Sequence, residues 1–268
     1  MCLILLACYA HPDYPLIIAA NRDEAYVRMA APAAFWGDHP HLHAGRDLEK
    51  SGTWLGITRT GRIAAVTNYR AGYTPKDAPR SRGELVSQFL LGNDNTVGYL
   101  GQVAAHGDEY NGFSLIAGDL DALYFVSNRG AGIERISPGV HGLSNHLLDT
   151  PWPKVERGKR ALQNLLAADE AALVAGLFDF LAERTTAGDQ ALPDTGVGVQ
   201  RERELSPAFI GGERYGTRAS TLVLVRNNGE VLFRERSFGA GGGALGEACS
   251  RFTLEKTAGP LRAACTLS

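Results

Sequence analysis

The second residue of the chain is a cysteine, and at this position a thiol can carry its own base. Removal of Met1 is sterically easiest when the next residue is small, and Cys2 meets that condition. The thiol of the shortened chain would lie beside a free α-amine, whose ordinary pKa is about 7.7–8.0. An amine with this pKa accepts a proton at neutral pH, so a single residue would supply both the nucleophile and the general base.

Two other interpretations of this N-terminus have to be weighed. Cys2 can be a small buried hydrophobe at the head of an apolar run, and this alternative stays open. The stretch Leu5–Cys8 resembles a lipoprotein box, but no Lys or Arg precedes Arg22 and the apolar run ahead of Cys8 is too short for a signal peptide. No other stretch approaches the ~20 apolar residues of a membrane span. We therefore expect mature protein from the start and no integral membrane segment.

Two apolar runs predict a hairpin that brings Cys2 close to a polar tetrad. Residues 2–9 and 16–20 are apolar, and turn residues fill 11–15. The far end of the second strand, at residues 21–24, would then lie beside Cys2. There Asp23 would hold the amine and Arg22 would favour the thiolate. A polar surface loop with an Arg–Asp pair is the alternative interpretation of the tetrad.

The remaining patterns predict antiparallel sheets with separate helices. A second hairpin at 53–58 and 62–68 ends in a strand tip that presents Asn68 and Tyr69, and a helix is expected after Ser81. The order of elements lacks strict βαβ alternation, and we see no linker, so we expect one α+β domain over residues 1–268. Helices are further expected at 96–105, 155–166 and 171–181, and strands at 113–117, 123–127, 139–144, 220–225 and 231–238.

Composition excludes several classes of partner. The chain is 44% hydrophobic and 21% charged, as in ordinary globular proteins, and its net charge of -2 comes without a block of Lys or Arg, so we expect no nucleic acid. The four cysteines lack C-x-x-C spacing, which favours a reducing, cytoplasmic setting. His39, His41 and His43 alternate, but Pro40 favours a loop, and we expect no metal site.

Seven short stretches of the chain form a distinctive set when they are taken together. They are Ala20-Asn21-Arg22-Asp23-Glu24, Gly52-Thr53-Trp54-Leu55-Gly56, Thr67-Asn68-Tyr69-Arg70, Ser81-Arg82-Gly83-Glu84-Leu85-Val86, Gly142-Leu143-Ser144-Asn145, Pro151-Trp152-Pro153-Lys154 and Tyr215-Gly216-Thr217-Arg218-Ala219-Ser220-Thr221. This set resembles the NRDE family, also called the transport and Golgi organisation protein 2 family. The resemblance runs in order from residue 2 to about residue 238, so it covers nearly the whole chain.

The resemblance implies an N-terminal-nucleophile (Ntn) hydrolase fold, a four-layer αββα sandwich of two antiparallel sheets between helical layers. More distantly, the family is similar to cysteine amidases that cleave bile-salt conjugates and penicillin V. By position, Cys2 matches their nucleophile and Asp23 their amine-binding carboxylate. Arg22 departs from the pattern, because the amidases space the arginine and the aspartate further apart. Asn145 matches a later Asn suited to an oxyanion hole, Arg218 matches the late Arg that organises the site, and Asn68 matches the other Asn more loosely.

Two functions follow from these patterns. The first is a cysteine Ntn hydrolase that cleaves an amide or thioester bond of an acyl compound, with Asn68 or Asn145 and a backbone N–H stabilising the oxyanion. The second is a non-catalytic carrier of haem or of acyl-CoA and lipid, because the resembled family is linked to both. No cofactor is required, and haem is a candidate ligand. The expected catalytic residues are Cys2, Arg22, Asp23, Asn68, Asn145 and Arg218, and the expected binding residues are Asn21, Glu24, Trp54 and Tyr69.

Overall fold

The computed structural model describes residues 2–70 and 78–255, which form two antiparallel sheets. Sheet A has six strands in the order β10-β1-β2-β11-β12-β13, and sheet B has seven in the order β3 to β9. The strands of sheet A are β1 Cys2–Cys8, β2 Leu16–Ala25, β10 Gly139–Leu143, β11 Tyr215–Val225, β12 Glu230–Phe238 and β13 Ala244–Thr253. Those of sheet B are β3 Ala30–Phe35, β4 Leu42–Asp47, β5 Leu55–Thr58, β6 Ile63–Asn68, β7 Phe113–Gly118, β8 Leu123–Ser127 and β9 Glu134–Arg135.

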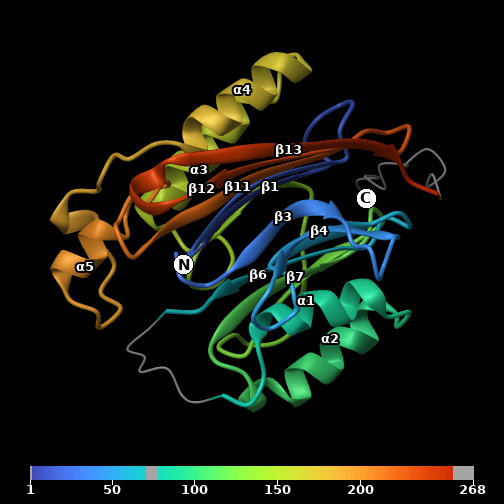
Figure 1. Ribbon diagram of the computed structural model, residues 1–268, viewed down its shortest axis with the longest axis horizontal. Helices are drawn as coiled ribbons and strands as arrows, with labels where there is room; N and C mark the ends of the chain where they lie inside the picture. Colours follow the sequence, from blue (N-terminus) through green and yellow to red (C-terminus); the bar gives the residue numbers. More distant parts are fainter. Residues whose placement is uncertain (1, 71–77, 256–268) are drawn as a thin grey trace, which may run out of the picture.

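Helices cover the outer face of each sheet. Figure 1 shows α3 and α4 above sheet A, and α1 and α2 below sheet B, with the two sheets between them. The predicted four-layer sandwich of antiparallel sheets is therefore confirmed. None of the helices in the described part of the chain is both long and apolar enough to span a bilayer. The helices are α1 Arg82–Leu91, α2 Thr96–Ala105, α3 Pro153–Leu165, α4 Glu170–Leu181 and α5 Val199–Glu204.

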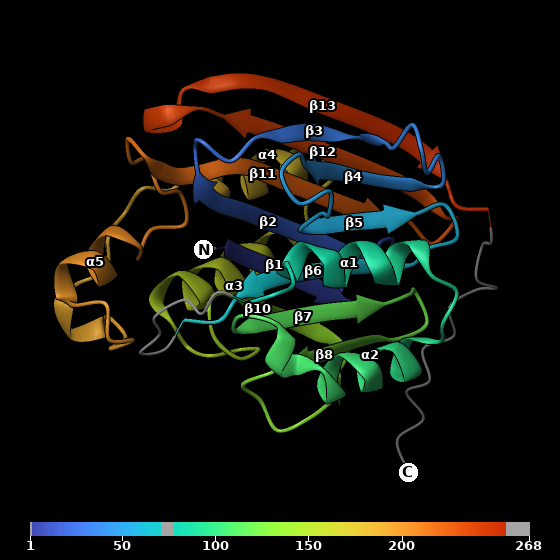
Figure 2. The ribbon, with the colours of Figure 1, turned by 60° about the horizontal axis from the view of Figure 1, so that its bottom comes forward.

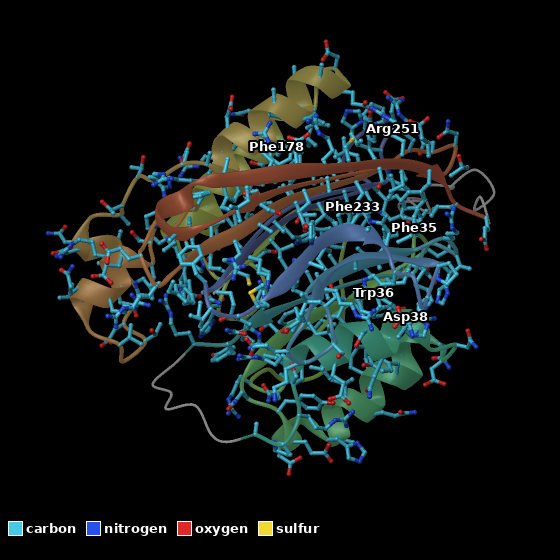
Figure 3. All side chains as sticks on the ribbon, viewed as in Figure 1. Phe35, Trp36, Asp38, Phe178, Phe233 and Arg251 are labelled. Atoms are coloured by element: carbon cyan, nitrogen blue, oxygen red, sulfur yellow. The ribbon has the colours of Figure 1, made fainter. Side chains whose placement is uncertain are left out.

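Strand β1 is apolar on both faces because each face is buried against a different layer. Ile4 and Leu6 belong to the core between the sheets, whereas Leu3 and Leu5 pack under α3 and α4. Strand side chains alternate between faces, so a continuous apolar run is what a doubly covered strand requires. Figure 3 shows the side chain of Phe233 in the space between the two sheets.

Most predicted elements are found, with differences at their ends. The hairpin of β1 and β2 and the hairpin of β5 and β6 are confirmed. Helix α1 begins where it was expected, but Ser81 makes no cap hydrogen bond through its side chain, and the Glu84 carboxylate pairs with Arg80 instead. Four strands were not predicted, namely β3, β4, β9 and β13.

Candidate active site

The register of β1 and β2 places Cys2 directly opposite Arg22. Directly opposed residues of an antiparallel pair project from the same face of the sheet. Ile4 and Ala20 are the next pair on this face, and both belong to the core between the sheets. The Cys2 thiol and the Arg22 guanidinium therefore both lie on the face of sheet A that packs against sheet B, at the end where β1 begins. Figure 2 shows the N-terminal end of β1 on the side of the molecule where α1 begins.

Burial and neighbouring groups act on the pKa of the Cys2 thiol in opposite directions. Burial raises the pKa most, and the charge of Asp23 raises it further. A backbone hydrogen bond from Asp23 and the charge of Arg22 lower it. Burial wins this balance, so the thiol is protonated at neutral pH in the resting protein and a base is needed to generate the thiolate.

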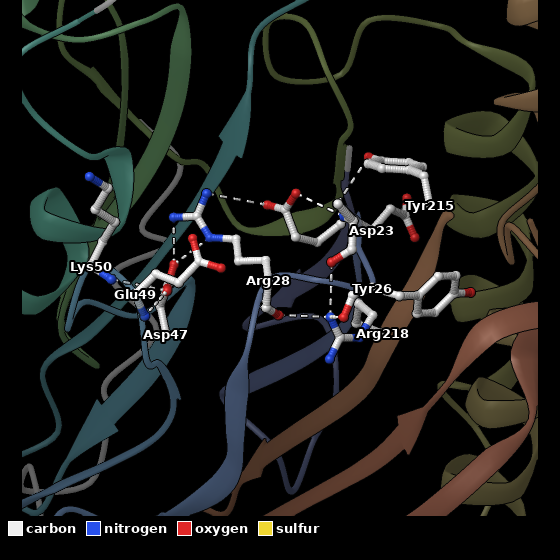
Figure 4. Close-up of polar contacts among 10 residues, drawn as sticks. Asp23, Tyr26, Arg28, Asp47, Glu49, Lys50, Tyr215 and Arg218 are labelled. Carbon is white, nitrogen blue, oxygen red and sulfur yellow. Dashed lines mark hydrogen bonds and ion pairs between the residues drawn. The ribbon is translucent and has the colours of Figure 1, made fainter. Parts of the chain in front are cut away.

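Asp23 projects from the opposite face of β2, towards α3. Its side chain is 2% exposed, and its Oδ1 accepts a hydrogen bond of 2.7 Å from the Thr217 hydroxyl. The Tyr215 hydroxyl donates to its backbone carbonyl at 3.0 Å, as Figure 4 shows. Burial raises the pKa of the Asp23 carboxyl, while the charges of Lys154 and Arg22 lower it. The carboxylate is thus fixed in position beside the start of β1.

Two cavities meet at Arg22 and Trp54, whose side chains line both of them. The first, which we call the thiol cavity, measures about 420 Å³ and is lined by Cys2, Asp23 and Asn68 among others. The second, which we call the side cavity, measures about 270 Å³ and lies between Trp54 and strands β3, β12 and β13. The Arg22 guanidinium stacks on the Trp54 ring, with 4.2 Å between its carbon and the ring centroid. This stacked pair forms the partition between the cavities.

The structure separates the two predicted asparagines. Asn68, at the end of β6, lines the thiol cavity. Asn145 has no exposed surface and does not line that cavity; its Nδ2 donates to the Asn68 backbone carbonyl at 3.0 Å. The Ser144 hydroxyl in turn donates to the Cys2 carbonyl at 3.0 Å. Asn145 and Ser144 therefore brace the two strand ends that carry Asn68 and Cys2.

Arg218 lines the side cavity and clamps the turn between β2 and β3. Its Nη1 donates to the backbone carbonyls of Ala25, Tyr26 and Arg28, at 3.0, 3.2 and 2.9 Å (Figure 4). The next cation, Arg28, pairs with Asp47 at 2.6 Å. The late arginine thus organises backbone at the rim of the site and does not reach the thiol cavity.

The four predicted binding residues fall into two groups. Trp54 and Glu24 line the thiol cavity. Asn21 and Tyr69 line neither cavity. The Asn21 amide donates to two buried carbonyls and accepts from Ser220, and the Tyr69 hydroxyl bonds His146 at 2.7 Å. Asn21 and Tyr69 are therefore placed as structural supports behind the site.

A buried lysine that was not among the expected site residues lies near Asp23. Lys154, in the first turn of α3, is 2% exposed, and its Nζ donates to the Leu205 carbonyl at 3.1 Å. Burial lowers the pKa of Lys154 to about 8, and the charges of Asp23 and Cys2 act against this effect. The burial of Lys154 could have been predicted from helical spacing. Lys154 precedes Gly158 and Leu162 by four and eight residues, so all three lie on the buried face of the helix.

A buried ion pair lies close enough to Lys154 for its charges to act on that lysine. Arg70 and Glu202 are 2.9 Å apart, with side chains 10% and 3% exposed. The Arg70 guanidinium lies over the Trp152 ring at 4.9 Å. Within residues 2–70 and 78–255, no group of three or more His, Cys, Asp or Glu side chains is arranged to hold a metal ion. The site is therefore built from a thiol, carboxylates and buried cations.

Known proteins resemble this chain over most of its length. A family model described as Transport and Golgi organisation 2 matches residues 1–240. The Transport and Golgi organization protein 2 homolog of Bos taurus is 40% identical over 265 residues, which cover 88% of this chain and 93% of the relative. The homolog of Homo sapiens is 38% identical over 261 residues, with the same shares covered.

Two solved structures show a weaker likeness. A penicillin V acylase from Agrobacterium tumefaciens has a TM-score of 0.46 at 10% identity, over 96% of this chain and 87% of its own. A Caenorhabditis elegans ortholog of N-acylethanolamine-hydrolyzing acid amidase has a TM-score of 0.43 at 11% identity, over 83% of this chain and 92% of its own. The family assignment rests on the sequence matches, and by these the chain belongs to the Transport and Golgi organisation 2 family.

Proposed function

We propose that the chain is a cysteine Ntn hydrolase that cleaves an amide or thioester bond of an acyl compound. The observation that carries the proposal is the register of β1 and β2, which sets the Cys2 thiol in the wall of the thiol cavity, opposite Arg22. Asn68 lines the same cavity, and Asp23 is fixed beside the start of β1. A nucleophile, a candidate oxyanion donor and an amine-binding carboxylate thus occur together.

The chemistry requires the α-amine of Cys2, released by removal of Met1. The amine takes the thiol proton, and the sulfur attacks the acyl carbonyl carbon. An N–H of the Asn68 side chain and a backbone N–H stabilise the oxyanion, and loss of one such donor typically costs about 10²–10³ in rate. The C–N or C–S bond then breaks and the leaving group takes the proton. Water attacks the Cys2 thioester next, with the amine again as base, and releases the acid and the thiol.

The test is to trap the acyl group on Cys2. Wild type, Cys2→Ala and the control Cys249→Ala, which removes an exposed thiol, are incubated with medium-chain acyl amides and acyl thioesters. We expect the acyl mass on the N-terminal peptide of wild type and of the control, together with turnover that Cys2→Ala lacks. Equal turnover by Cys2→Ala would refute the nucleophile. Turnover by protein whose intact mass still includes Met1 would refute the amine as base.

A second proposed function, binding and transport of haem or acyl-CoA without turnover, is favoured by one observation. Burial raises the pKa of the Cys2 thiol, which opposes formation of the nucleophilic thiolate. Cys2→Ala would then retain saturable binding of haem, followed by absorbance, or of long-chain acyl-CoA, followed by tryptophan fluorescence. The cationic side chains that line the thiol cavity would support an anionic ligand, and they are Arg22, Arg28, Lys50, Arg80 and Arg82. The absence of saturable binding with both ligands would remove this function.

A further inference from the structure

The first turn of α3 buries an ammonium group whose hydrogen-bond acceptor is uncharged. Lys154 is 2% exposed, and its Nζ donates to the Leu205 carbonyl at 3.1 Å. A methionine of similar length would fill the same space without a buried charge, so packing alone does not account for a lysine at this position. The charge of Lys154 therefore acts on the groups that face it from other elements.

Four charged or titratable groups act on Lys154 through space. They are Asp23 of β2, Cys2 of β1, Arg70 beyond the end of β6, and Glu202 of α5. The Glu202 carboxylate is already paired with Arg70 at 2.9 Å, and its other oxygen accepts a backbone N–H at 3.0 Å. Among the charges, that of Asp23 acts most strongly on Lys154. The ammonium of Lys154 therefore chiefly offsets the charge of Asp23.

Close packing of α3 on sheet A brings Lys154 towards the start of β1. A Cβ on Gly158 would lie 2.6 Å from the Leu5 side chain, so the helix approaches β1 closely. Lys154 is one turn earlier on the same buried face of α3. In the register of β1 and β2, Asp23 lies one position beyond the partner of Cys2. Asp23 is therefore close both to the nitrogen that begins β1 and to the Lys154 ammonium.

The other groups near Asp23 do not replace this positive charge. The Cys2 thiol and the hydroxyls of Tyr26 and Tyr215 are neutral at neutral pH, because burial raises the pKa of each. Arg22 is a further cation that acts on Asp23, but it acts less strongly than Lys154 and lies on the face of sheet A that packs against sheet B. Lys154 is thus the stronger of these two cationic side chains at Asp23.

A carboxylate that holds an α-amine also favours the protonated form of that amine. An opposite charge nearby raises the pKa of an amine, and the effect is larger in a buried site because the local dielectric constant is low. An amine held by Asp23 alone would remain an ammonium at neutral pH and could not take the thiol proton. A second positive charge beside Asp23 opposes this effect, because it lowers the proton affinity of the groups around it.

We propose that Lys154 is a positioning residue of the proposed hydrolase. Its buried ammonium offsets the charge of Asp23, so that this carboxylate holds the α-amine of Cys2 without keeping it protonated. The inference rests on the proposed function in that it concerns the amine of the same site. Its main test follows the protonation of the amine and needs no turnover, so the two proposals can fail separately.

The test follows the amine in Cys2→Ala protein, which cannot form an acyl-enzyme. The protein is released from an N-terminal fusion by cleavage before residue 2, so the amine is present whatever the fate of Met1. Acetic anhydride acetylates the unprotonated amine, and the tryptic peptide of residues 2–22 contains no lysine. The acetylation rate of this peptide against pH therefore gives the pKa of the amine. We expect a value no higher than the ordinary one of about 8.

In this background, Lys154→Met should raise the pKa of the amine by about one unit, because it removes the nearby positive charge. Lys154→Arg retains the charge and should leave the pKa close to that of the parent. The matched control is Arg160→Gln, which removes an exposed charge from the same helix and should leave the pKa unchanged. In protein that retains Cys2, Lys154→Met should move the acidic limb of the kcat/KM profile to higher pH by the same amount and leave the alkaline plateau unchanged.

A pKa above about 9 for the amine of the Cys2→Ala parent would overturn the proposal, and this result needs no further variant to fold. An unchanged or lowered pKa in Lys154→Met would overturn it as well. If the pKa rises as expected but wild type hydrolyses no acyl compound, the role of Lys154 stands and the proposed hydrolase fails. If wild type and Lys154→Met hydrolyse an acyl compound with the same pH profile, the hydrolase stands and the role of Lys154 fails.

Discussion

Replacing Lys154 with methionine should stabilise the protein at neutral pH. Burial lowers the pKa of Lys154 to about 8 from an ordinary 10.5. This difference corresponds to about 3 kcal/mol, which is the cost of keeping the ammonium charged in the folded chain. Methionine has a similar length and carries no charge. It loses the hydrogen bond to the Leu205 carbonyl, which contributes about 1 kcal/mol, so the expected net gain at pH 7 is about 2 kcal/mol.

The sign of the pH dependence follows from the lowered pKa. Below pH 8 both the folded and the unfolded chain hold the Lys154 proton, and the folded chain bears the full cost of the buried charge. Between about pH 8 and 10.5 the unfolded chain binds more protons than the folded one, so the free energy of unfolding of wild type rises with pH. Lys154→Met lacks this contribution, and its advantage over wild type should therefore shrink across the same range.

Urea unfolding at pH 7, 8, 9 and 10 measures both quantities. The matched control is Lys50→Met, because Lys50 is exposed and its replacement should change the free energy of unfolding by less than about 0.5 kcal/mol at each pH. A constant difference between wild type and Lys154→Met over this range would refute the argument that Lys154 is held charged at a cost. A decrease of more than about 1 kcal/mol in the free energy of unfolding of Lys154→Met at pH 7 would also refute this argument.

Two further outcomes test the supports of the site. Asn145→Ala removes the side-chain donor to the Asn68 carbonyl and should lower the free energy of unfolding by about 1–3 kcal/mol. The control Asn164→Ala, on the exposed side of α3, should lower it by less than about 0.5 kcal/mol. Equal effects of the two substitutions would contradict the bracing role of Asn145. Arg218→Gln removes a shared donor from three carbonyls and should speed amide hydrogen exchange in residues 25–28, so unchanged protection there would show that the turn is held by other contacts.

The first hairpin could be predicted because its two apolar runs and the turn between them fit few structures other than a pair of buried strands. The apolar runs that became β1 and β2 are buried on both faces, and the turn residues between them fix where the chain reverses. Strands β3, β4 and β13 were missed for the opposite reason. All ten residues of strand β13 are exposed or partly exposed, and β4 includes His43 and Arg46, so neither shows a simple apolar alternation.

The site was partly predictable, because a hairpin brings the first residue of its first strand beside the last residues of its second strand, independently of the rest of the fold. This joined Cys2 to Arg22 and Asp23. The relative placement of Asn68 and Asn145 was not predictable, since it depends on how the end of sheet A lies against β6. Lys154 was missed because its charge matters only in relation to groups that are distant in sequence, and α3 brings it to them.

The position of the Cys2 thiol depends on the alternation of side chains along β1. Cys2 and Leu3 are adjacent, yet one faces the thiol cavity and the other the helices above sheet A. A slip of the hairpin by one residue would exchange these two environments and move the thiol away from Arg22, whereas a slip by two would return a side chain to the cavity face. Insertions or deletions within β1 or β2 are therefore compatible with this site only in even numbers, and length variation belongs in the turn at 9–15.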